Sequence, residues 1–186
     1  MRVSINDLAK TANLAGATLG AQHLHKVAAK ISCDDEIVIL DFTGVESATG
    51  SYLKALVFGF LEDPAAKLKG AFPVVTRMNS LVREELVYLT SLTTYRIVEG
   101  LKFHGDEVVH ARLHGELDPA LKTTLDVLLR RGAASATELH AKGGESIAIT
   151  AWNNRLADLY AKRLVMRRRA GKQWLYEPIS REFDNG

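Results

Sequence analysis

Residues 37–56 read IVILDFTGVESATGSYLKAL, and they place a strand signal directly before a helix signal. The first six residues form an apolar run, interrupted only by Asp41, between Cys-Asp-Asp-Glu and Thr-Gly. A run of this length, rich in branched side chains, favours a buried central strand over a helix. Residues 51–61 follow a helical pattern that Glu-Asp-Pro ends. A buried strand followed by a helix predicts an α/β fold.

Strand and helix signals continue to alternate on both sides of this stretch. Strands are predicted at residues 2–5 and 71–76, and helices at residues 17–31 and from Ser80, as the capping residue, to about Leu92. Two further strands, 96–103 and 107–114, flank His-Gly-Asp, which is typical of a hairpin turn. Together these elements predict a mixed α/β domain over residues 1–115.

A second group of helix signals follows residue 115. Asp118 is a suitable N-cap and Pro119 suits the first helical position, so a helix is expected to begin there. It is expected to end at Gly132, with two arginines in its last turn that favour the helix dipole. Ser135 and Glu138 then have the spacing of a capping box, which predicts a second, shorter helix.

A third helix and a hairpin complete this region. Thr150 is expected to cap the helix, which continues to about Leu164. Residues 165–178 read VMRRRAGKQWLYEP and are typical of two strands joined by a tight Ala-Gly-Lys turn. Helix, short helix, helix and hairpin in this order predict a winged helix-turn-helix domain over residues 118–178. Residues 179–186 are expected to be a tail.

The third helix and the hairpin carry the residues that would contact DNA. In a winged helix-turn-helix, the N-terminal residues of the second paired helix meet base edges in the major groove. Here these residues are Thr150, Trp152, Asn153, Asn154 and Arg155. Asparagine can form two hydrogen bonds with adenine, and arginine can do the same with guanine. Trp152 could instead be a core or interface residue.

The predicted wing is strongly basic. Its cationic residues are Arg167, Arg168, Arg169 and Lys172. They are expected to contact the DNA backbone or minor groove, although a run of arginines can also be an ordinary solvated surface. Residues 118–178 carry 11 Lys/Arg and 6 Asp/Glu, whereas residues 1–117 carry 12 and 14. Such an asymmetry is expected if only the C-terminal part contacts a polyanion. Residues 118–178 also resemble the winged-helix modules of bacterial transcription regulators, which implies binding of double-stranded DNA.

The stretch at 37–56 resembles the signature of STAS-like domains, relatives of the anti-sigma-factor antagonists. The matching residues are Asp41, Thr43, Gly44 and Val45, then a short loop, 46–51, and a helix opened by small hydroxyl residues. The alternation of strands and helices fits that family over about residues 1–95. The resemblance implies a domain that docks a protein partner or senses a signal.

The same resemblance points to a phosphorylation site. In the antagonists, a GHKL-type kinase phosphorylates a serine at the N-terminus of this helix, and the phosphate switches partner binding. This sequence has Thr49-Gly50 where the antagonists have Asp-Ser, so Gly50 fills the acceptor position. The neighbouring hydroxyl residues, Thr49 and Ser51, are the candidate phospho-acceptors, and each could also be a plain helix cap. A phosphate there would be stabilised by free backbone N–H groups and the positive helix end.

Other features argue against an enzyme, a cofactor site or a membrane protein. The 186 residues contain no G-x-S-x-G elbow, Walker loop or H-E-x-x-H motif. The single cysteine, Cys33, allows neither an intramolecular disulfide nor a thiolate metal cluster. His104, His110 and His114 gather on the predicted hairpin without a carboxylate or thiolate at a fitting spacing, so no metal is expected. Without a bilayer-length apolar run or a secretory signal pattern, a cytoplasmic location is expected.

These observations favour a non-enzymatic transcriptional regulator, in which the STAS-like domain docks or senses and the winged helix reads an operator. The alternative is an interaction subunit of a multi-protein bacterial assembly, with a GHKL-type ATPase or in phage defence. Such a subunit would bind DNA without sequence preference, or bind protein. A third interpretation is a phosphorylatable antagonist in which the winged helix is secondary.

One winged helix covers one half-site, so the regulator is expected to be a homodimer. The hairpin of residues 96–114 is the candidate interface, unless it completes the sheet of its own domain.

Overall fold

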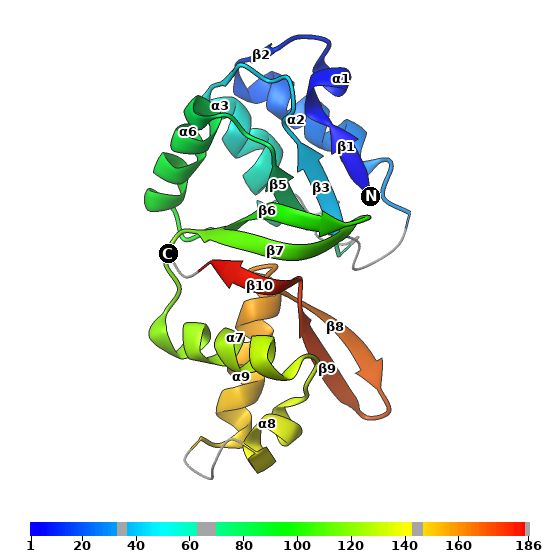
Figure 1. The fold of residues 1–186 in the computed structure, drawn as a ribbon, viewed down its shortest axis with the longest axis vertical. Helices are drawn as coiled ribbons and strands as arrows, with labels where there is room; N and C mark the ends of the chain where they lie inside the picture. Colours follow the sequence, from blue (N-terminus) through cyan, green and yellow to red (C-terminus); the bar gives the residue numbers. More distant parts are fainter. Residues whose placement is uncertain (33–36, 63–69, 143–146, 185–186) are drawn as a thin grey trace. The chain divides into compact units, whose positions relative to one another are not determined.

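The computed structural model describes residues 1–32, 37–62, 70–142 and 147–184 (Figure 1). Cys33 lies outside these ranges. The chain forms two compact units, one of Met1–Gly115 with the C-terminal residues from Phe183, and one of Glu116–Glu182. Its central sheet is mostly parallel and is accompanied by helices, which confirms the α/β class.

A six-stranded sheet has the order β1-β3-β5-β6-β7-β10. Its strands are β1 (Arg2–Ser4), β3 (Ile37–Asp41), β5 (Phe72–Thr76), β6 (Ile97–His104), β7 (Glu107–His114) and β10 (Ser180–Asp184). The first four strands in this order are parallel, and β7 returns antiparallel to β6. At the end of β3, Asp41 lies opposite Ser4 of β1 on one side and opposite Thr76 of β5 on the other.

Helices supply the connections that parallel strands require. They are α1 (Ile5–Ala9), α2 (Ala17–Ala28), α6 (Ser80–Ser91), and a run formed by α3 (Gly50–Leu53), the π-helical turn η1 (Lys54–Phe58) and α4 (Gly59–Glu62). A small parallel ladder of β2 (Asn13–Leu14) and β4 (Ser47–Ala48) ties the start of α2 to the start of α3.

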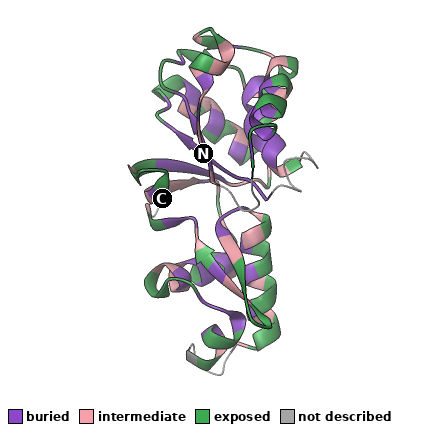
Figure 2. Cartoon of the chain, turned by 90° about the vertical axis from the view of Figure 1, so that its right-hand side faces the viewer, coloured by how far each residue is buried: buried purple, intermediate pink, exposed green. Residues whose placement is uncertain are grey.

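The main core of the first unit lies between these helices and one face of the sheet. Val38 and Leu40 of β3 belong to this core, together with side chains of α2, η1 and α6. Ile39, which alternates with them, points to the other face and is also fully buried. The expectation of a buried central strand is therefore confirmed, and the strand ends at Asp41, one residue before the end of the predicted run. Figure 2 shows the buried residues concentrated in the interior of each unit.

Two predictions about the first unit are corrected. Asn79, and not Ser80, caps α6: its Oδ1 accepts from the Val82 N–H at 2.9 Å, and its Nδ2 donates to the Val45 and Glu46 carbonyls. The amide has one acceptor oxygen and two N–H donors, so it bonds the Val82 N–H and two carbonyls at once, whereas a serine hydroxyl has a single proton to donate. The predicted tail at 179–186 contains strand β10, which adds to the sheet beside β7.

The position of β10 also decides whether the hairpin of residues 96–114 has a free strand edge for a second chain. Strands β6 and β7 complete the sheet of their own unit, with β5 on one side and β10 on the other. An edge that is already paired cannot add a strand from a second chain. The hairpin of residues 96–114 therefore does not offer the free edge that a strand-paired dimer would need.

The second unit contains three helices and a hairpin in the predicted order. They are α7 (Pro119–Arg131), α8 (Ala136–Lys142), α9 (Ile149–Ala161), and the antiparallel pair β8 (Val165–Ala170) and β9 (Gln173–Pro178). The start and end of α7 follow the predicted signals, because Asp118 Oδ1 accepts from the Ala120 N–H and Gly132 has a φ of 76°.

The capping box before α8 is confirmed in both directions. The Ser135 hydroxyl accepts from the Glu138 N–H at 3.2 Å, and the Glu138 carboxylate accepts from the Ser135 N–H at 2.8 Å. Thr150, by contrast, does not cap α9. The helix begins at Ile149, and the carbonyl of Ala148 accepts its first bonds from Ala151 and Trp152. Thr150 therefore lies inside the first turn.

No helix in the described ranges is both long enough and apolar enough to cross a bilayer.

Candidate nucleic-acid interface

Helix α9 has one buried side and one outward side. Trp152, Leu156 and Leu159 are buried against the rest of the second unit. The opposite side repeats at a spacing of four, three and four residues, and all its members are exposed: Thr150, Asn154, Ala157 and Ala161. Two alanines and two short polar residues on this side would let a partner come close to the helix backbone, and the Asn154 amide is able to form two hydrogen bonds with a base edge.

The predicted base-contacting residues differ in their exposure. Asn153 and Asn154 are exposed, and Arg155 is half-buried with its guanidinium 5.7 Å from the centre of the Trp152 ring. Trp152 is only 3% exposed, so the structure places its ring in the core, which was one of the alternatives to a DNA contact. Its indole N–H has no hydrogen-bond partner within the described residues.

The basic residues of the hairpin lie on both of its faces. Side chains alternate along a strand, so Arg167 and Arg169 share one face with Trp174, while Arg168 lies on the other. The Arg167 guanidinium lies 4.0 Å from the ring centre of Tyr160, on α9, and 4.4 Å from that of Trp174. The contact joins the hairpin to α9 by cation–π attraction and packing. These contacts give half-buried Arg167 a structural role in this unit.

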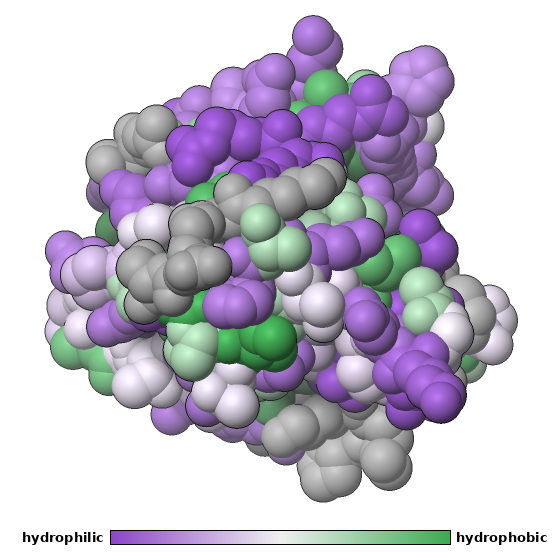
Figure 3. All heavy atoms as spheres, turned by 90° about the horizontal axis from the view of Figure 1, so that it is seen from below, coloured by the Kyte–Doolittle hydropathy of each residue, from purple (hydrophilic) through white to green (hydrophobic). Residues whose placement is uncertain are grey.

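The other three cations are available to a ligand. Arg168, Arg169 and Lys172 are exposed, and Lys172 lies at a turn that Gly171 makes with a φ of 61°. Arg169 stacks on Trp174 at 4.2 Å without losing its exposure. Among the described residues, no acidic side chain forms an ion pair with any of the three. Figure 3 shows a face on which hydrophilic residues prevail and hydrophobic residues form only small groups.

A polar cluster in the first unit surrounds Asp41, at the carboxyl end of β3. The Asp41 carboxylate accepts from the N–H and hydroxyl of Thr43 at 3.0 and 2.6 Å. Arg2 and Arg77 each place a guanidinium nitrogen 3.4 Å from its other oxygen. Burial raises the pKa of Asp41, but the bonds from Thr43 and the two guanidinium groups outweigh it and lower this pKa below its ordinary value. The carboxylate therefore stays ionised and fastens the loop after β3.

The two candidate phospho-acceptors have different environments. The Thr49 hydroxyl accepts from the backbone N–H groups of Gly16 at 3.1 Å and Tyr52 at 3.4 Å, so Thr49 is the N-cap of α3. Ser51 is exposed, and among the described residues its hydroxyl bonds only with that of Thr49, at 3.1 Å. A carboxylate oxygen of Glu85, from α6, lies beside Gly50 at the helix start. Both residues are exposed, but Ser51 has the less engaged hydroxyl and is therefore the better candidate for phosphorylation.

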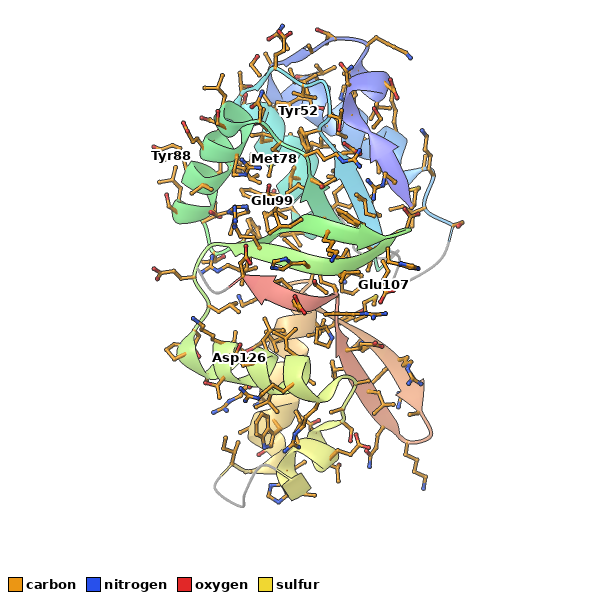
Figure 4. The ribbon with its side chains drawn as sticks, in the orientation of Figure 1. Tyr52, Met78, Tyr88, Glu99, Glu107 and Asp126 are labelled. Carbon is orange, nitrogen blue, oxygen red and sulfur yellow. The ribbon has the colours of Figure 1, made fainter. Side chains whose placement is uncertain are left out.

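A buried ionic cluster was not predicted from the sequence. Glu99, on β6, is 1% exposed and accepts from Arg83 Nη2 of α6 at 2.8 Å (Figure 4). The other carboxylate oxygen lies 2.8 Å from His114 Nε2 on β7. Burial raises the pKa of Glu99, but the hydrogen bonds and charges of His114 and Arg83 together lower it to about 2. The one signal in the sequence is a glutamate inside the apolar strand pattern RIVEGLKF.

The histidines of the hairpin do not converge on one point. His110 pairs with Asp184 at 2.6 Å, whereas His114 pairs with Glu99. Within the described ranges, no three His, Cys, Asp or Glu side chains are grouped so that they could hold a metal ion.

Comparisons of this chain with protein families, with curated proteins and with solved structures found no match.

Proposed function

We propose that the protein is a non-enzymatic, DNA-binding transcriptional regulator whose second unit is a winged helix-turn-helix domain. The observation that carries this proposal is the outward side of α9, where Asn154 lies between Thr150 and two alanines. Exposed Asn153 and half-exposed Arg155 flank that side. In this proposal α9 enters the major groove and Asn154 reads a base edge.

The hairpin supports the same function by its charge. Arg168, Arg169 and Lys172 would neutralise phosphates on either side of the groove that α9 occupies. The excess of basic residues in 118–178 favours a polyanionic ligand as well. In this proposal Arg167 acts indirectly, by holding the hairpin against Tyr160.

For the first unit we propose a STAS-like domain that docks a protein partner or senses a signal. Support comes from the order of its parts: a buried strand, Asp41 bonded to Thr43, a fixed loop, and a helix that Thr49 caps. A GHKL-type kinase or ATPase is the proposed class of partner, and we place the protein in the cytoplasm. The alternative function, an interaction subunit of a larger assembly, is favoured by the exposed apolar side chains of α6.

Selection of bound sequences from random duplexes tests the proposal directly. A regulator would enrich one sequence, and a charged clamp would enrich none. With the enriched duplex, Arg168→Ala, Arg169→Ala and Lys172→Ala should each weaken binding to all sequences alike. Each loss should also reduce the slope of log affinity against log salt by about one unit per phosphate contact. Lys54→Ala, which removes an exposed charge from the first unit, is the matched control and should leave the slope unchanged.

Asn154→Ala should behave differently from the hairpin variants. A bidentate contact discriminates against the wrong base by about 1–3 kcal/mol, so its loss should relax preference at one base pair. The salt slope should change little, because no charge is removed. Measured affinities for the enriched duplex and its single-base variants decide between the two behaviours. A uniform loss across all sequences would instead favour the assembly subunit.

Ser51 should carry the phosphate if a phosphoswitch exists, because the Thr49 hydroxyl is engaged as a helix cap. Mass spectrometry of the protein from its native host should find the modification on Ser51. Ser51→Asp should change affinity for the partner, since a new negative charge would repel the neighbouring Glu85 and alter the surface of α3 and α6. Ser47→Asp, an equal change at an exposed position of β4, is the control. Unmodified protein in every growth condition, with an inert Asp variant, would reduce this region to a helix start.

A further inference from the structure

Two arginines of the second hairpin share one indole ring. Trp174, on β9, lies directly opposite Arg169 of β8 and diagonally opposite Arg167. The guanidinium groups of Arg169 and Arg167 lie 4.2 and 4.4 Å from the centre of this ring. Groups so close to one ring are also close to each other. Two positive charges are therefore held together on one face of the hairpin.

No carboxylate compensates these two charges. Among the described residues, neither Arg167 nor Arg169 forms an ion pair with an acidic side chain. A guanidinium that stacks on a ring uses its flat face for the contact, so the N–H donors in its plane stay available. These donors match the oxygens of a phosphate group. Exposed Arg169 can thus stack on Trp174 and bind an anion at the same time.

The ring also connects Arg169 to the helix that is proposed to read bases. Along this face of the hairpin, exposure increases from Tyr176, which is buried, through half-buried Arg167 and Trp174 to exposed Arg169. The Arg167 guanidinium lies 4.0 Å from the ring centre of Tyr160, on α9. One series of contacts therefore runs from α9 through Arg167 and Trp174 to Arg169. Such a series fixes the place of Arg169 relative to α9.

Arg168 provides an internal comparison, because it carries the same charge without a ring. It lies opposite Leu175 on the other face of the hairpin, and no aromatic ring in the described ranges contacts its guanidinium. An exposed arginine of this kind loses side-chain freedom when it binds phosphate, and this loss weakens the contact. Arg169 is already restrained by Trp174 before any ligand arrives. A phosphate contact from Arg169 should therefore be the stronger of the two.

We infer that Trp174 is a positioning residue, which holds the Arg169 guanidinium in place for a phosphate of the DNA backbone. The inference rests on the proposed function, because the phosphate belongs to the duplex that α9 enters. Trp174 itself makes no contact with the DNA and acts through Arg169. Restraint of Arg169 in the free protein lowers the entropy that binding costs. The link to α9 sets the distance between the base contact and this phosphate contact.

A double-mutant cycle in the full chain tests this role. Arg169→Ala should reduce the affinity for a duplex about tenfold, and Trp174→Leu several-fold. The double variant should bind as Arg169→Ala does, because the ring acts only through that guanidinium. Arg167 keeps its contact with Tyr160 in all of these variants. A ring that only stabilised the hairpin would cause the same further loss with and without Arg169, and this result would overturn the inference.

The matched control uses the other face of the hairpin. Arg168→Ala removes the same charge, and its effect should simply add to that of Trp174→Leu in free energy. A coupling to Trp174 as large for Arg168 as for Arg169 would contradict a specific positioning role.

Two further measurements separate positioning from loss of structure. Trp174→Phe keeps a ring on which a guanidinium can stack, so it should recover most of the affinity that Trp174→Leu loses. Trp174→Leu should keep the wild-type slope of log affinity against log salt, because no charge is removed. Arg169→Ala should lower this slope by about one unit. Equal losses in Trp174→Phe and Trp174→Leu, with both variants folded by circular dichroism, would overturn the inference.

The cycle can be measured with an enriched duplex or with one of random sequence, so the inference and the proposed function can fail separately. Coupling between Trp174 and Arg169 in a protein that enriches no sequence would reject the regulator and keep the inference. Additive losses on an enriched duplex would keep the regulator and overturn the inference. Absence of binding to any duplex at low salt would overturn both.

Discussion

Ala157→Glu is expected to reduce the affinity of the full chain for its enriched duplex at least 100-fold, with no change in the fold. Ala157 is exposed at the centre of the outward side of α9, one turn beyond Asn154. A glutamate there would carry a negative charge into a groove lined by phosphates and would keep the helix backbone away from the bases. Glutamate is a good helix former, so α9 itself should remain stable. Fluorescence anisotropy at fixed salt measures the affinity, and circular dichroism checks the fold.

The matched control places the same charge elsewhere in the second unit. Thr123, on α7, is exposed, and Thr123→Glu changes the net charge of the unit by the same amount. It should reduce affinity only a few-fold, through long-range repulsion that added salt removes. If Ala157→Glu binds as tightly as Thr123→Glu, then α9 does not face DNA. In that event the hairpin alone attracts nucleic acid, and the assembly subunit becomes the better explanation.

Both ends of α7 and the start of α8 could be predicted because the deciding residues are neighbours in sequence, whereas the predicted cap of α9, Thr150, lies inside its first turn. Asp118 caps through the N–H two residues later, and Ser135 and Glu138 bond each other across three residues. Gly132 ends α7 through its own positive φ. Such signals need no knowledge of the tertiary structure.

Predictions failed where distant residues decide the outcome. Asn79 caps α6 in place of Ser80 because its amide also holds the loop carbonyls of Val45 and Glu46, more than 30 positions earlier. Strand β10 forms next to β7, and Asp184 at its end pairs with His110, at a separation of 74 residues. In both cases the two partners are too far apart in sequence to belong to one local pattern.

The sequence predicted which residues belong to the candidate site, but it did not predict the role of each residue. The sequence shows three consecutive arginines in the hairpin, but it does not show which of them contacts aromatic rings. In the structure the Arg167 guanidinium contacts the rings of Tyr160 and Trp174, whereas Arg168 lies on the opposite face and is exposed. Trp152 was open to two interpretations because α9 is amphipathic around it, and its burial decides for the core.

Glu99→Gln is expected to destabilise the first unit by about 3 kcal/mol, because an uncharged amide replaces the buried carboxylate that pairs with both Arg83 and His114. Glu99 bonds Arg83 and His114 at once, so one substitution weakens the connection of α6 to both β6 and β7. The corresponding loss in melting temperature is roughly 10–20 °C, measured by calorimetry. Glu84→Gln, the same change at an exposed position of α6, should stay within about 0.5 kcal/mol of the wild type.

Lowering the pH should remove the stabilisation that the ionised Glu99 carboxylate provides. The pKa of Glu99 is lowered from 4.5 to about 2 in the folded protein, so the unfolded chain binds its proton first as the pH falls. The stabilisation by the ionised group is therefore complete above about pH 4.5, and it is lost progressively as the pH falls from there toward 2. The difference in unfolding free energy between wild type and Glu99→Gln should narrow by roughly 3 kcal/mol over this range. Asp41 and Asp184 titrate alike in both proteins, so their contributions cancel in that difference. A difference that stays constant from pH 6 to pH 2 would mean that the charge of Glu99 does not stabilise the fold.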